Sequence, residues 1–135
     1  MKPALLYEDK YLQILWDSQA RVISIDWKES TSEMTDEDFK TELTLFAKHV
    51  EDQRAPRILI DVSKFYHRPG KEVSEWRRRT ISIRYNAAGV QRFAFLLSPD
   101  SQISPTADQS SEGELFLTQA FNDRDQALAW LTPSE

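Results

Sequence analysis

The chain has 135 residues, of which 40% are hydrophobic and 29% are charged, and its net charge is −5. This length and composition predict one globular domain with a single hydrophobic core. The absence of cysteine excludes disulfides, thiolate nucleophiles and cysteine-based metal sites, and the negative charge disfavours binding to bulk nucleic acid.

Two alternating apolar segments near the N-terminus predict an antiparallel hairpin. In residues 11–16 and 22–27, hydrophobic residues recur at every second position, as in a strand with one buried face. The polar residues 17–20 between them suit a turn, and a short strand is expected to begin earlier, at residues 5–7. We therefore expect this hairpin at one edge of a sheet.

A helix is predicted to begin after Thr35 and to end before Pro56. Thr35 is a good N-cap, and the acidic first turn favours the helix dipole. The next segment, residues 57–63 (RILIDVS), is apolar without alternation, which is typical of a strand covered on both faces in a parallel sheet. Ligands of such sheets gather beyond the carboxyl ends of the strands, so we look for function at Asp61 and the following loop. One core stripe of the helix comprises Phe39, Leu43, Phe46, Ala47 and Val50.

The second half of the chain continues the alternation of helices and strands. A helix is predicted over residues 72–88, with Gly89 as its C-terminal cap, followed by a buried strand at 92–97. Residues 98–113 predict a loop, 114–121 a last strand, and Asn122 or Asp123 caps a terminal helix. The apolar face of the 72–88 helix is predicted to comprise Val73, Trp76, Thr80, Ile83 and Ala87, and the sheet core Ile58, Ile60, Phe93 and Phe95.

This order predicts an α/β fold. It comprises a mostly parallel sheet with an antiparallel N-terminal hairpin and with helices covering the sheet. Nothing in the sequence indicates a repeat or a second domain, so residues 1–135 are expected to form a single domain.

Five segments of the chain match a known pattern: residues 23–27 (ISIDW), 58–62 (ILIDV), 73–76 (VSEW), 89–95 (GVQRFAF) and 121–131 (FNDRDQALAWL). Taken in this order along the chain, they resemble the STAS-like family of anti-sigma-factor antagonists and sulfate-transporter C-terminal domains. The match is closer to a small bacterial branch grouped with CRAL-TRIO lipid-binding domains. The resemblance covers nearly the whole chain and implies a non-catalytic binding or regulatory module.

One departure from that family concerns a phosphorylation switch. Anti-sigma-factor antagonists carry a phosphorylatable serine in an Asp-Ser-Ser-Gly-like turn at the start of the helix after the central strand. Here residues 67–74 read HRPGKEVS, and the nearby Ser63 and Ser74 do not lie in such a motif. A phosphoserine switch is therefore not expected.

Charge is unevenly distributed along the chain. Residues 64–92 hold eight basic and two acidic residues, a charge of +6, which leaves −11 on the remainder. Most charge runs are solvated faces, and Arg77, Arg78 and Arg79 cannot all face one partner. The alternative is that Arg68, Lys71, Arg77 and Arg78 converge near the amino end of the 72–88 helix and attract an anion, either a lipid headgroup, a phosphate or an acidic partner protein.

The loop after the central strand supplies the remaining candidate residues. Asp61 is a candidate ligand anchor, although a carboxylate at a strand end more often accepts hydrogen bonds from the following loop. Tyr66 and His67 lie in that loop, and Trp27, Phe65, Tyr66 and Trp76 are candidates to line an apolar pocket, with Tyr66 the best placed to face a ligand. A hydrolase-like enzyme using Asp61 and His67 is the alternative, disfavoured because no nucleophile accompanies them.

The expected function is therefore ligand binding without catalysis. The candidate ligand-binding residues are Asp61, Tyr66, His67, Arg68, Lys71, Arg77 and Arg78, with no catalytic residue, metal or cofactor. The expected partner is a small amphiphilic or anionic ligand or a protein, and a homo-oligomeric structural role stays open. We expect a soluble cytoplasmic protein, because no signal-peptide pattern or membrane-spanning run is present. We expect no binding to nucleic acid, because the net charge is negative.

Overall fold

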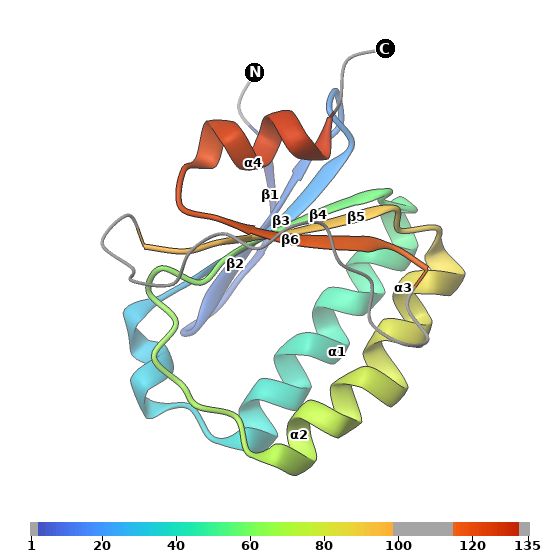
Figure 1. Cartoon of the computed structure of the whole chain (residues 1–135). Helices are drawn as coiled ribbons and strands as arrows, with labels where there is room; N and C mark the ends of the chain where they lie inside the picture. Colours follow the sequence, from blue (N-terminus) through green and yellow to red (C-terminus); the bar gives the residue numbers. More distant parts are fainter. Residues whose placement is uncertain (1–2, 99–114, 133–135) are drawn as a thin grey trace.

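Six strands form one mixed sheet in the order β1-β2-β3-β4-β5-β6 in the computed structural model, which describes residues 3–98 and 115–132 (Figure 1). The first three strands are antiparallel to one another, and β3 to β6 are parallel neighbours. The predicted α/β fold with its N-terminal antiparallel hairpin is confirmed. The strands are β1 (Ala4–Glu8), β2 (Leu12–Asp17), β3 (Val22–Trp27), β4 (Arg57–Asp61), β5 (Arg92–Leu96) and β6 (Leu117–Phe121).

The described helices cover both faces of this sheet (Figure 1). On one face lie α1 (Asp36–Gln53), which follows a short 3-10 helix, and a second long helix. That second helix is formed by α2 (Lys71–Trp76), a π turn (Arg77–Ile81) and α3 (Ser82–Ala88). On the other face lies α4 (Arg124–Leu131).

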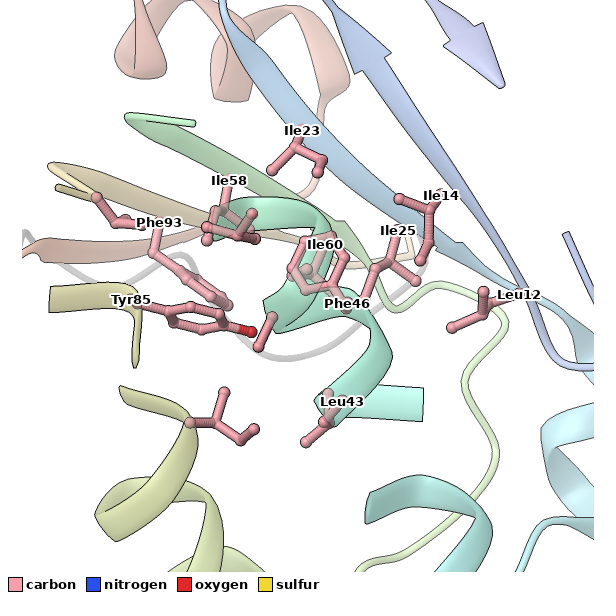
Figure 2. Close-up of a cluster of buried hydrophobic side chains, with 14 of the residues drawn as sticks. Leu12, Ile14, Ile23, Ile25, Leu43, Phe46, Ile58, Ile60, Tyr85 and Phe93 are labelled. Carbon is pink, nitrogen blue, oxygen red and sulfur yellow. The ribbon is translucent and has the colours of Figure 1, made fainter. Parts of the chain in front are cut away.

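Alternation along the central strands divides the core between the two faces. Ile58 and Ile60 of β4 point to the α1 side (Figure 2). Leu59 between them packs with α4 on the other face. Phe93 of β5 likewise joins the α1 side, where its partner in register is Ile58. The prediction of parallel strands covered on both faces is confirmed, although Phe95 is only half-buried.

The helix ends use the caps that the sequence predicts. Thr35 accepts a hydrogen bond from the backbone N–H of Asp38, and the Asp38 side chain accepts one from the Thr35 N–H, which completes a capping box. Asp123 caps α4 by accepting a hydrogen bond from the backbone N–H of Gln126. Gly89 ends α3 with φ of 90°, a conformation in which a side chain would be strained.

The second long helix departs from the predicted register. A backbone hydrogen bond from the Ser82 N–H to the Arg77 carbonyl spans five residues, so the turn holds one residue more than an α-helix would. Beyond this π turn every side chain is displaced around the helix. Ile81 and Tyr85 are therefore buried, whereas the predicted core positions Thr80, Ile83 and Ala87 are exposed.

One acidic side chain is buried on α1. Glu42 is 5% exposed, and one of its carboxyl oxygens is buried without a hydrogen bond to accept. Burial, and then the neighbouring carboxylate of Asp9, raise the pKa of Glu42 to about 8. Burial also raises the pKa of Asp9, but hydrogen bonds from Glu42, the Tyr11 N–H and the Tyr7 hydroxyl outweigh it and lower the pKa of Asp9. Glu42 is therefore protonated at neutral pH and donates to Asp9.

The predicted last strand is shorter than expected. β6 begins at Leu117, whereas the sequence suggested residue 114. The predicted loop over residues 98–113 lies almost wholly outside the described residues, as does residue 114.

Candidate ligand-binding cavity

A cavity of about 230 Å³ lies on the face of the sheet that carries α1 and the second long helix. Its walls come from β3, β4 and β5, from α1, from the loop after β4, and from the second long helix. The lining residues are Ile25, Trp27, Phe39, Leu43, Ile60, Val62, Phe65, Pro69, Ser74, Arg77, Tyr85, Phe93 and Phe95.

Aromatic rings form much of this wall. The ring centroids of Trp27 and Phe65 lie 4.9 Å apart, those of Phe39 and Phe65 5.5 Å apart, and those of Phe93 and Phe95 4.9 Å apart. These tilted geometries are the ones that aromatic pairs prefer. Such a wall offers an apolar ligand a large contact area without requiring the protein to bury unpaired polar groups.

In the described part of the chain, Arg77 is the one charged side chain that lines the cavity. It lies one helical turn after Val73, which is buried, and its own side chain is half-buried. No hydrogen bond or ion pair to the guanidinium occurs within the described ranges 3–98 and 115–132. A half-buried guanidinium without a carboxylate partner is uncommon, because desolvating a charge is costly unless an opposite charge compensates it.

Tyr85 stands close to this guanidinium. Its side chain is 3% exposed, and its ring packs against Phe46, Phe93 and Phe116. Burial raises the pKa of the Tyr85 hydroxyl, and the nearby charges of Arg77 and Arg84 oppose this shift. The hydroxyl therefore stays protonated at physiological pH and is available as a hydrogen-bond donor.

The loop after β4 closes one side of the cavity, and it is fixed by two polar contacts. The backbone N–H of Tyr66 donates to the hydroxyl of the fully buried Thr31 at 2.8 Å. The Nε2 of His67 lies 2.8 Å from a carboxylate oxygen of Asp36 at the start of α1. The loop therefore presents Phe65 and Pro69 to the cavity from a fixed backbone.

A polar cluster lies at the carboxyl edge of the sheet and contacts the loop after β4. Asp61 accepts hydrogen bonds from the Ser63 N–H at 2.9 Å and the Ser63 hydroxyl at 2.6 Å, and from the Arg124 guanidinium at 3.1 Å. Asp26, the register partner of Asp61 on β3, lies 3.5 Å from Arg124. Burial, with a smaller contribution from Asp61, raises the pKa of Asp26, while Arg124 opposes the shift. Asp61 thus anchors its loop.

The sequence-predicted site residues do not gather at one place in the structure. Only Arg77 lines the cavity, while Arg68, Lys71 and Arg78 are exposed and Tyr66 is 56% exposed. At the amino end of α2, where an anion was expected, the Asp36 carboxylate lies 3.4 Å from the Gly70 N–H. Within the described structure, no hydrogen bond joins Asp61 to His67, the pair on which a hydrolase would depend.

Sequence reasoning missed part of the cavity wall. Trp27 and Phe65 were considered as pocket residues and do line it, whereas Trp76 packs beside the core beneath Lys40. Phe39, Phe93 and Phe95 were assigned only to the core. Arg77 was the residue that could have indicated the cavity from the sequence. It lies four positions after Val73, so it is a charged residue on the apolar stripe of the helix.

Comparisons with known proteins add no relative: no family model, no curated protein and no solved structure matches the chain. Among the residues that the structure describes, no helix is both long and apolar enough to cross a bilayer. Nor does any group of three or more His, Asp or Glu side chains in the described part of the chain stand where it could hold a metal ion.

Proposed function

We propose that this protein is a non-catalytic binding module that holds a small amphiphilic, lipid-like molecule in the cavity beside the second long helix. The observation that carries the proposal is the aromatic, apolar wall of this cavity, on which Arg77 is the only charged residue within ranges 3–98 and 115–132. Burying an apolar chain there removes its surface from water, which contributes about 25 cal/mol for each Å² buried.

The size of the cavity limits the ligand. Its volume of about 230 Å³ exceeds the roughly 150 Å³ of an engineered apolar cavity that binds benzene. It falls below the roughly 300 Å³ at which pockets for drug-sized ligands begin. At ~30 Å³ for each water-sized group, it accommodates about eight such groups. A single chain of about eight carbons fits this space, whereas a two-chain phospholipid does not.

The fold supports the same proposal. A mixed sheet with an antiparallel N-terminal hairpin and helices on both faces is the arrangement that a STAS-like domain would have. A cytoplasmic location belongs to the proposal as well, since a chain without cysteine needs no oxidising compartment.

Titration with 1-octanol tests the proposal because this probe is apolar and carries no charge. We expect saturable binding, detected as a shift of the Trp27 indole N–H resonance and as a rise in Tm with 1-octanol concentration. Val62→Phe should weaken binding at least tenfold, because it places a ring in the cavity. The matched control is Ile83→Phe on α3, whose side chain is 59% exposed and outside the cavity.

Two results would contradict the proposed function. One is the absence of saturable 1-octanol binding to the wild-type protein. The other is equal binding by the Val62→Phe and wild-type proteins, which would place the ligand elsewhere.

A further inference from the structure

We propose that the polar end of the ligand is a carboxylate, bound by the guanidinium of Arg77 and the hydroxyl of Tyr85. This inference rests on the proposed function and names the chemical class that the cavity selects. The protein would then distinguish a fatty-acid-like or similar compact monoanion from a neutral amphiphile of the same length.

Arg77 and Tyr85 provide donors that the described protein leaves unused. Both side chains line the cavity, and within residues 3–98 and 115–132 neither the guanidinium nor the hydroxyl has a hydrogen-bond acceptor. Arg84, on the next turn, shows the contrast, because its guanidinium holds Glu51 at 2.6 and 2.9 Å. An arginine fork matches the two oxygens of a carboxylate, and such charge-assisted pairs are the stronger hydrogen bonds of proteins.

The π turn explains how both donors face the same space. Val73 and Arg77 are four residues apart, so they share a face of the helix. Without the inserted residue, that face would continue through Thr80 and Arg84, but the π turn brings Ile81 and Tyr85 into line instead. Figure 2 shows the ring of Tyr85 beneath Phe93, with its hydroxyl pointing toward the inside of the cluster. π turns often occur where a helix must redirect a side chain for function.

Charge balance favours a monoanion over a phosphate. Among the residues that the structure describes, Arg77 is the only charged one on the cavity wall, and Tyr85 and Ser74 add neutral hydroxyls. A carboxylate carries one negative charge, which this guanidinium can neutralise. A phosphomonoester carries roughly two at neutral pH, so the second charge would be desolvated without compensation.

The exposed arginines beside Arg77 supply a matched control. Arg78 and Arg79 lie in the same π turn, are exposed, and do not line the cavity. Arg79→Gln changes the net charge as Arg77→Gln does and leaves the cavity wall intact. A difference between these two variants therefore reports contact with the ligand and not the long-range field of the basic segment.

Calorimetric titration of octanoate and 1-octanol into the full chain tests the assignment. The wild type should bind octanoate at least about tenfold more tightly than 1-octanol, as expected for a charge-assisted pair. Arg77→Gln should bring the two affinities within about threefold by weakening octanoate alone, whereas Arg79→Gln should keep the wild-type preference. Arg77→Lys should restore part of the preference, and Tyr85→Phe should reduce it a few-fold.

The outcomes separate the two proposals. If 1-octanol binds but octanoate binds no better, the carboxylate assignment is wrong and the cavity proposal stands. If Arg77→Gln weakens both ligands equally, or Arg79→Gln removes the preference as fully, then Arg77 does not contact a carboxylate. If neither ligand binds the wild-type protein, both proposals are wrong. The wild-type comparison needs no variant, so the test holds even where a substitution impairs folding.

Discussion

Replacing Glu42 with glutamine should make the protein more stable at alkaline pH. The folded protein keeps a proton on Glu42 up to a pKa of about 8, whereas the unfolded chain releases it near the ordinary value of 4.5. The unfolded state therefore binds fewer protons between these values, and the free energy of unfolding falls as the pH rises through this range. Glutamine cannot ionise, and its amide can donate to Asp9 as the protonated carboxyl does.

The size of the effect follows from that pH range. Each unit of pH between 4.5 and about 8 lowers the free energy of unfolding by at most about 1.4 kcal/mol, so the full range lowers it by at most about 5 kcal/mol. Asp9 is half-buried, which gives water some access to the pair and reduces the penalty, so we expect about 2–3 kcal/mol. The lowered pKa of Asp9 acts near and below 3.8 and does not contribute in this range.

Urea unfolding from pH 5 to pH 9 measures this difference. Glu42→Gln and the wild type should agree within about 1 kcal/mol at pH 5 and should diverge by about 2–3 kcal/mol at pH 9. Glu37→Gln, on the exposed side of the same helix, is the control and should follow the wild type at every pH. Equal pH dependence for the wild type and Glu42→Gln would refute the reasoning, since it would mean that Glu42 ionises normally in the folded protein.

Three further predictions concern the caps, the loop and the basic segment. Thr35→Ala removes the N-cap of α1 and should destabilise the protein by about 1 kcal/mol in urea unfolding, while Thr41→Ala, on the exposed side of α1, should cost less. Asp61→Asn keeps one acceptor for Ser63 but weakens the pair with Arg124, so the fold should persist with a loss of about 1 kcal/mol; failure to fold would contradict the anchoring role. Charge reversal at the exposed Arg68 and Lys71 together should leave octanoate affinity within about twofold, and a steep, salt-sensitive loss would place the anion at the amino end of α2.

The sequence predicts well those features that depend on local pattern. The apolar run at residues 57–61 has no alternation, which indicates a strand covered on both faces. The structure confirms this, because Ile58 and Leu59 pack on opposite sides of the sheet. Thr35, Asp123 and Gly89 cap helices because their side chains, or the lack of one, satisfy local geometry. Such signals need only a few neighbouring residues.

Features that depend on tertiary context could not be predicted in the same way. The predicted buried face of the second long helix was based on 3.6 residues per turn throughout. The π turn inserts one residue, so Thr80 and Ile83 lie outside the core and Tyr85 lies in it. The sequence does not indicate the raised pKa of Glu42, because that shift depends on burial and on Asp9, which is 33 residues away in the chain. Arg77 looked like one member of an exposed run because its environment depends on the walls contributed by distant strands.

The central claim is that the cavity beside the π turn holds the ligand, and a crystal structure of the protein grown with octanoate tests it most directly. We predict density for the alkyl chain among Trp27, Phe39 and Phe65, with the carboxylate within hydrogen-bond distance of Arg77. A cavity that stays empty at saturating octanoate, or octanoate bound only at another surface, would contradict the account.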